Sequence, residues 1–94
     1  MSVYRKYADH ILLNLLKEDD QLAYTEIFER YSRLLVNHAY KMIGNQDESN
    51  DVVQEVFLFI WNKRHELEIT GSLSSYLYKA TKNKILNHIA HEKV

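Results

Sequence analysis

Residues 45–65 read NQDESNDVVQEVFLFIWNKRH, and this stretch decides the fold. Its apolar residues recur at steps of three and four, the spacing that places side chains on one face of an α-helix. Asn45 followed by Glu48 is the pattern of a capping box at a helix N-terminus. The stretch therefore predicts a helix that begins at Asn45 and ends near residues 63–65. The residues expected in its buried stripe are Val53, Val56, Phe57 and Ile60.

Two more helices are expected before this stretch. The apolar residues within residues 4–16 keep helical spacing, and the polar run at residues 17–20 ends the pattern. Asp19 or Asp20 can cap a longer helix, which ends where Gly44 suits the left-handed position after a helix. The expected apolar face of that longer helix is Tyr24, Ile27, Phe28, Tyr31, Leu34, Leu35, Ala39 and Ile43.

A last helix is expected after residues 70–72, which read TGS and break the helical spacing. Thr70 or Ser72 can cap it, and it should extend from about Leu73 towards His91. Proline is absent and the chain has two glycines, whereas a β fold of this length would need many turns. The sequence therefore predicts an all-α fold, a compact bundle of about four helices.

Length and composition exclude several classes of protein. The 94 residues are expected to form one domain, residues 1–94. The absence of cysteine excludes disulfide scaffolds, thiolate zinc sites and cysteine nucleophiles. No apolar run approaches the roughly 18 residues of a membrane span, and the N-terminus is no signal peptide, so the expected location is the cytoplasm. No catalytic, metal-binding or cofactor-binding pattern stands out, so neither an enzyme nor a cofactor is expected.

Acidic and basic residues are unevenly distributed, although the formal net charge is only −1. Residues 44–60 hold four acidic side chains and no lysine or arginine, whereas residues 71–94 hold four lysines and one glutamate. On a helical wheel of the acidic segment, a polar stripe lies opposite the apolar face. Its members are Asp51, Gln54, Glu55 and Leu58. This stripe is either an ordinary solvated face with one exposed leucine or a docking ridge for a basic partner.

The last expected helix has a face of mixed chemistry. An aromatic ring, a cation and two amides share an arc of about 80° on the helical wheel. They are Tyr76, Lys79, Asn83 and Asn87. Cations bind phosphates, amides hydrogen-bond to base edges and a ring can stack on a base, so this face suits nucleic acid. The alternative is an ordinary exposed surface, since charged helix faces are common.

Three stretches together resemble a known family. Residues 51–61 (DVVQEVFLFIW) resemble the signature helix of bacterial RNA polymerase sigma factors, in the extracytoplasmic-function (ECF) group of the sigma-70 family. Residues 23–31 (AYTEIFERY) are similar to the helix that precedes it there, and residues 71–83 (GSLSSYLYKATKN) to the helix that reads the promoter. The three motifs occur in the family's order, and the resemblance extends from about Ile11 to Lys93.

The resemblance implies a sigma region 2 domain, which is part of a transcription initiation factor. Its acidic helix would bind the clamp helices of core RNA polymerase through the polar stripe. Its last helix would hold the melted non-template strand of the minus-ten promoter element through the mixed face, and a loop at about residues 62–72 would receive a flipped base. An anti-sigma factor is a further partner that the resemblance allows.

Two features depart from the family's pattern. Tyr76 stands where the family often has tryptophan, and residues 89–93 lack the arginines usual there, which weakens the expected hold on phosphates. Such sigma factors normally also have a helix-turn-helix domain, and this chain has no segment for one, so it is expected to be a piece of a longer protein. The alternative function is that of a helical protein-interaction module that binds no DNA.

Overall fold

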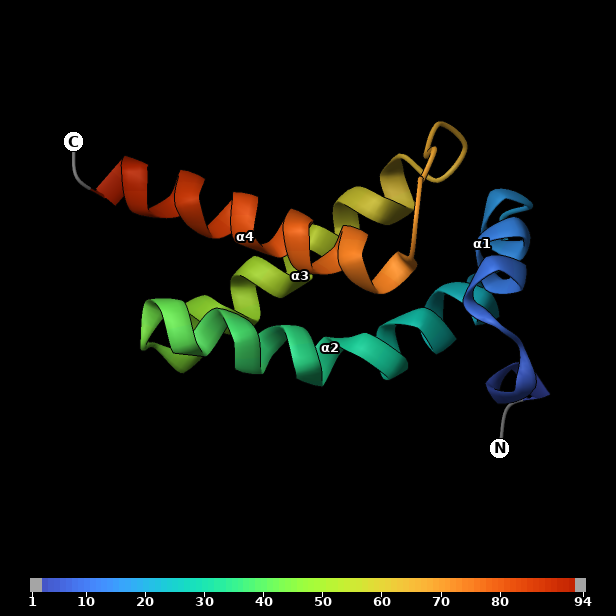
Figure 1. The fold of residues 1–94 in the computed structure, drawn as a ribbon, viewed down its shortest axis with the longest axis horizontal. Coiled ribbons are helices and arrows are strands. Elements are labelled where there is room, and N and C mark those ends of the chain that lie inside the picture. Colours follow the sequence, from blue (N-terminus) through green and yellow to red (C-terminus); the bar gives the residue numbers. More distant parts are fainter. Residues whose placement is uncertain (1–2, 93–94) are drawn as a thin grey trace.

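Four α-helices and one short 3₁₀ helix make up the chain (Figure 1). The computed structural model describes residues 3–92, and of residues 91 and 92 it describes the backbone alone. The elements are η1 (Val3–Lys6), α1 (Asp9–Lys17), α2 (Gln21–Ile43), α3 (Gln46–Asn62) and α4 (Leu73–Glu92). The predicted all-α fold with four helices is confirmed. Lys93, where the sequence resemblance ends, lies outside the described residues.

The longest helix, α2, is the frame on which the others pack. It contacts η1, α1, α3 and α4, and α3 also packs against α4. Figure 1 shows α2 and α4 extending along the long axis, α3 crossing obliquely behind α4, and α1 at the end where α2 begins. The molecule measures 43 × 28 × 21 Å. The three longer helices therefore form one layered unit, and the 63–72 segment connects α3 to α4 near α1.

Side-chain caps define where three helices begin. Asp20 caps α2, Asn45 caps α3 and Ser72 caps α4, each with an oxygen that accepts a hydrogen bond from a first-turn backbone N–H. In the two cases where the sequence left alternatives, one of the two predicted residues is the cap. Gly44 follows α2 with a φ of 76°, which confirms the left-handed position expected for it.

The first helix is shorter than the sequence predicts, because Tyr4 belongs to η1 and α1 begins only at Asp9. Tertiary contacts hold the N-terminal residues away from a continuous helix. Arg30 Nη2 donates to the carbonyl oxygens of Tyr4 (3.0 Å) and Tyr7 (2.6 Å), and Tyr4 Oη donates to Asp20 Oδ2 (2.6 Å). These bonds turn the N-terminal segment back onto α2, so the expectation of one helix from residue 4 is wrong.

The hydrophobic core forms where α3 and α4 press on α2. The four residues expected in the buried stripe of α3 are all buried, with 1–2% of their surface exposed. Val52 and Ser49 join them, which makes the buried face of α3 wider than predicted. On α2 the expected apolar face is only partly buried, since Phe28 and Leu34 are 39% and 50% exposed. The neighbouring helices cover these two positions of α2 only in part.

Candidate functional site

A groove between α3 and α4 gathers the whole mixed face that the sequence singles out. It holds a volume of about 380 Å³. Its walls are Val56 and Phe59 from α3, with Tyr76, Lys79, Ala80, Asn83, Lys84 and Asn87 from α4. We call it the α3–α4 groove. All four residues predicted to bind DNA line it, so the structure brings them to one concave surface.

The packing of α4 explains why these side chains face the groove. Leu73, Leu77, Thr81 and Ile85 follow one another at intervals of four and are buried against the rest of the bundle. The hydroxyl group of the buried Thr81 is hydrogen-bonded, since its Oγ1 donates to Leu77 O (2.8 Å). Because these four residues face the core, the side chains at the neighbouring positions of α4 face either α3 or solvent.

The α3–α4 groove combines three kinds of chemistry. Lys79 supplies an exposed cation, and Asn83 and Asn87 supply exposed amides that can donate and accept hydrogen bonds. Tyr76 is half-buried, and burial raises the pKa of its phenol, so the hydroxyl keeps its proton at neutral pH. Phe59 presents an aromatic ring that is 45% exposed. The surface can therefore hold a phosphate, a base edge and a base face at once.

The polar stripe of α3 is exposed along its full length, as expected. We call Asp51, Gln54, Glu55 and Leu58 the α3 stripe. Gln54 borders a depression of about 330 Å³ with Arg33 of α2, and Leu58 borders another of about 310 Å³ with Trp61. Leu58 itself is 57% exposed, a large apolar side chain beside acidic neighbours. The α3 stripe thus continues onto α2 and offers a mixed acidic and apolar surface to a partner.

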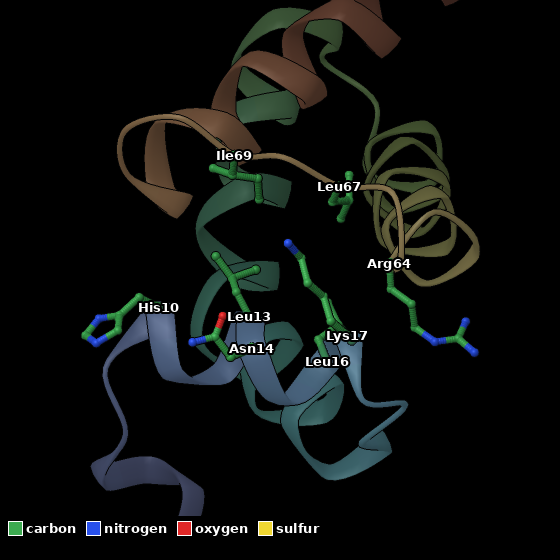
Figure 2. A pocket seen from close by; sticks show the side chains of 8 residues that line it. All are labelled: His10, Leu13, Asn14, Leu16, Lys17, Arg64, Leu67 and Ile69. Carbon is green, nitrogen blue, oxygen red and sulfur yellow. The ribbon is translucent and has the colours of Figure 1, made fainter.

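The 63–72 segment forms a second, smaller pocket with α1. The pocket holds about 190 Å³ and is lined from α1 and from residues 64–69. Figure 2 shows Leu67 and Ile69 facing Leu13 and Lys17 across it. Leu67 and Ile69 are half-buried on the core, so the segment lies folded against the bundle. This pocket lies in the loop where the sequence resemblance places a flipped base.

Residues 27–94 match the sigma-70 region 2 family. This chain belongs to that family. It is also 28% identical over 78 residues to the ECF RNA polymerase sigma factor SigW of Bacillus subtilis (strain 168). The matched part is 83% of this chain, and it spans 42% of the length of that relative.

The region 2 fold is matched as well. The NMR structure of an engineered region 2 of sigmaE, in complex with GTAAAA, superposes with a TM-score of 0.83. The match covers 99% of this chain and 95% of that one at 22% sequence identity. At this identity the likeness concerns the arrangement of helices. It includes α1, which precedes the residues matched by the family.

Three groove residues of this region 2 chain, Phe59, Ala80 and Lys84, are missed by sequence reasoning. Phe59 falls between the buried arc and the polar stripe of α3, and Lys84 falls beyond the mixed face of α4. Neither position is distinctive on a single helical wheel. They become neighbours only because α3 and α4 pack together. An aromatic residue just outside a buried arc, on the side of the next helix, is the signal that could have indicated Phe59.

The described part of this region 2 chain contains no cluster that suggests a metal. Among the residues searched, no three His, Cys, Asp or Glu side chains gather closely enough to hold an ion. Within residues 3–92, no helix combines the length and the apolarity that a membrane crossing would require. The surface features that remain are the α3–α4 groove, the α3 stripe and the pocket beside α1.

Proposed function

We propose that this chain is the part of a transcription initiation factor that binds core RNA polymerase and holds melted promoter DNA. The α3–α4 groove would bind the non-template single strand of the minus-ten element, and the α3 stripe would bind the polymerase clamp helices. Membership of the sigma-70 region 2 family supports this, as does similarity to a protein named an ECF RNA polymerase sigma factor. The engineered region 2 of sigmaE, whose fold is similar to that of this chain, is in complex with GTAAAA.

The observation that carries the proposal is the gathering of Tyr76, Lys79, Asn83 and Asn87 in one groove. Lys79 would bind a phosphate, Asn83 and Asn87 would hydrogen-bond to base edges, and Tyr76 would stack on a base. Stacking on an aromatic side chain contributes about 1–3 kcal/mol per base. These interactions become available only when the strands have separated, so the groove would select melted DNA over duplex.

The pocket beside α1 fits the same proposal. Its volume of about 190 Å³ leaves room for a single base turned out of the strand, with Leu67 and Ile69 as apolar walls. Unstacking a base costs a few kcal/mol, which burial in such a pocket would offset. The proposed activity consists of binding alone and requires no catalytic residue or cofactor.

The proposal also covers extent, partners and location. Residues 1–94 would form one region 2 domain, since α1 packs on α2 and the match of folds includes it. The partners would be core RNA polymerase and promoter DNA, with an anti-sigma factor as a further partner of this group. Since the polymerase acts in the cytoplasm, the chain would act there too.

A titration with single-stranded hexanucleotides tests the DNA part of the proposal. GTAAAA and its permutations would be titrated into the chain by NMR, which detects weak binding. Asn83→Ala should cost about 1–3 kcal/mol on the preferred sequence and little on a scrambled one. Lys79→Ala should weaken the binding of all hexanucleotides about equally. It should also reduce the slope of the logarithm of the binding constant against the logarithm of the salt concentration by roughly 0.7.

Lys82→Ala is the matched control for Lys79→Ala. Lys82 is an exposed lysine on α4 that does not line the α3–α4 groove. It should therefore affect binding much less than Lys79. If no hexanucleotide binds, and the chain still binds a protein partner through α3, the alternative of a protein-interaction module would replace the proposal.

A further inference from the structure

Asp19 connects two segments that are far apart in the sequence. It lies in the turn between α1 and α2 and has a φ of 65°, the only positive φ of a non-glycine residue among the described residues. Its Oδ1 accepts a hydrogen bond from Arg64 Nε at 2.8 Å. His65 Nε2 lies 2.6 Å from the same oxygen. One carboxylate thus holds two consecutive residues of the 63–72 segment.

Arg64 is itself held from a second direction. Its Nη1 donates to Trp61 O at 2.7 Å, and its guanidinium lies 3.9 Å from the centre of the Trp61 ring. The Arg64 side chain is 19% exposed, although Asp19 is 59% exposed. Hydrogen bonds from Arg64 and then from His65 lower the pKa of the Asp19 carboxyl, so it is charged at neutral pH. The contact therefore joins the end of α3 to the α1–α2 turn.

The segment that Asp19 holds has few other fixed points. The last backbone hydrogen bond that the described structure gives it before Ser72 runs from Leu67 N to Lys63 O (3.0 Å). Arg64, Leu67 and Ile69 all line the pocket, and Leu67 and Ile69 also pack on the core. Figure 2 shows the guanidinium end of Arg64 extending away from Leu67 and Ile69. The ion pair on the outer side and the apolar contacts on the inner side together fix the segment.

We propose that Asp19 is a positioning residue for DNA recognition, because it fixes the 63–72 segment, and with it the pocket beside α1, through Arg64 and His65. This inference rests on the proposed function, in which that pocket receives a base. Asp19 touches no DNA in this scheme. Exposed ion pairs contribute little to overall stability, so the effect of Asp19 is local to the segment and its pocket.

Asp19→Asn tests the inference, since asparagine tolerates the left-handed backbone, removes the charge and replaces one acceptor oxygen by an amide group. Hydrogen exchange of the hydrogen-bonded backbone amides of Arg64, Glu66 and Leu67 should become faster, while the melting temperature stays nearly unchanged. Trp61 is the only tryptophan, so its fluorescence should report the loosened Arg64. The preference for the best hexanucleotide over a scrambled one should fall on the order of three- to tenfold.

Glu18→Gln is the matched control. It removes a negative charge from the adjacent exposed residue, for which the structure gives no ion pair with the 63–72 segment. Exchange and sequence preference should match the wild type. Arg64→Gln should reproduce the Asp19→Asn phenotype, and the double variant should add little to either. Raising the salt concentration should bring the amide exchange rates and the sequence preference of the wild type closer to those of Asp19→Asn, because salt screens the exposed charges of the ion pair.

The outcomes separate this inference from the proposed function. A wild-type chain that prefers no hexanucleotide would overturn the proposed function and, with it, the DNA role of Asp19. A wild-type chain that does discriminate, alongside an Asp19→Asn variant with equal discrimination and equal exchange, would overturn the Asp19 inference alone. Faster exchange with unchanged discrimination would also overturn it, since Asp19 would then be only structural.

Discussion

Arg30 shows how much one side chain can organise. Its Nε donates to Glu26 Oε2 (2.9 Å), its Nη1 donates to Asp9 Oδ1 (3.0 Å), and its Nη2 donates to the carbonyls of the N-terminal turn. Glu26 is only 5% exposed, so the guanidinium also compensates a buried carboxylate. The N-terminal segment is thus attached to α2 by polar contacts, in a small domain with a limited apolar core.

Tyr31 belongs to the same cluster and gives a prediction about pH. Burial, a hydrogen bond to the Asp9 carboxylate and its charge raise the pKa of the Tyr31 phenol from 10.0 to about 12. A raised pKa means that the folded chain holds the proton more strongly than the unfolded chain does. The corresponding stability is present below pH 10 and is lost as the pH rises towards 12.

An absorbance titration of the tyrosines checks this. Tyr31→Phe should remove the phenol that ionises near pH 12 and should flatten the loss of stability between pH 10 and pH 12. Tyr40→Phe, at an exposed position of α2, is the control and should leave that late step in place. A late step that survives in Tyr31→Phe would assign it to another tyrosine.

Phe57 gives a prediction about the core. Its side chain is 1% exposed, its ring centre lies 4.9 Å from that of Phe28, and its carbonyl accepts a hydrogen bond from Tyr24 Oη (2.8 Å). Phe57→Ala should therefore destabilise the chain by about 3–5 kcal/mol. Since small domains have a free energy of unfolding of about 5–15 kcal/mol, the variant should melt well below the wild type.

The control for Phe57→Ala lies two residues further along α3. Phe59→Ala makes the same chemical change where the ring is 45% exposed, so it should cost much less stability. Urea denaturation of both variants, followed by circular dichroism, gives the comparison. Equal losses for the two variants would show that the buried face of α3 is assigned wrongly.

At the scale of elements, the α2–α3 turn rests on one glycine. Gly44 has a φ of 76°, its N–H donates to Tyr40 O (2.8 Å), and the next residue, Asn45, caps α3. No atom would crowd a Cβ at this position, so a side chain would be opposed only by the backbone conformation. Gly44→Ala should cost about 1–2 kcal/mol.

Gly44→Asn separates backbone conformation from loss of the turn. Asparagine adopts left-handed conformations more readily than alanine, so Gly44→Asn should fall between the wild type and Gly44→Ala in melting temperature. The same ranking is expected in denaturant. If the two variants were equally unstable, a cause other than the left-handed conformation would have to apply.

The elements also show which parts of the fold the sequence could predict. The buried stripe and the cap of α3 follow from residues close together in the chain, so helical spacing and capping chemistry predict them. The start of α1 cannot be predicted in this way, because it depends on hydrogen bonds from Arg30 to carbonyl groups that lie more than twenty residues away in the chain. Periodicity carries no information about such a contact.

The α3–α4 groove divides in the same way. Four of the α4 residues that line it, Tyr76, Lys79, Asn83 and Asn87, are predicted by one helical wheel, because they are neighbours on one helix, whereas Ala80 and Lys84 are not. Phe59 is not predicted, since it enters the groove only through the packing of α3 against α4. The contact between Asp19 and Arg64 joins residues 45 positions apart and depends on the whole bundle. The spacing of side chains predicts which residues share one face of a helix, whereas tertiary packing determines which helix faces come into contact.

At the scale of the whole molecule, one helix serves two surfaces. The α3 stripe lies on the outward side of α3, and Val56 and Phe59 of the same helix form a wall of the α3–α4 groove. The buried residues of α3 hold both surfaces in a fixed relation to α2. A partner on the α3 stripe would therefore orient the groove rigidly, which fits the proposed role of placing DNA relative to a polymerase.

This arrangement predicts that the two binding activities can be lost separately. Gln54→Ala combined with Glu55→Lys should weaken binding to core polymerase by about 1–3 kcal/mol, since it removes polar and charge-assisted contacts. Both residues are exposed, so the fold should be kept. Hexanucleotide binding should stay at the wild-type level, whereas Asn83→Ala should show the opposite pattern. A variant that combines all three substitutions should show both the full loss of polymerase affinity and the full loss of hexanucleotide affinity, because the two sites are independent.

Titration with core polymerase and with single-stranded DNA, on the same preparations, decides this prediction. Glu29→Lys reverses a charge at an exposed position of α2 outside the α3 stripe, and it should leave polymerase binding nearly intact. Unchanged polymerase affinity in a well-folded stripe variant would remove the α3 stripe from the interface. A stripe variant that also lost DNA binding would mean that the two surfaces are coupled through α3, and then the shared helix, with Phe59 on its groove side, would be the element to test next.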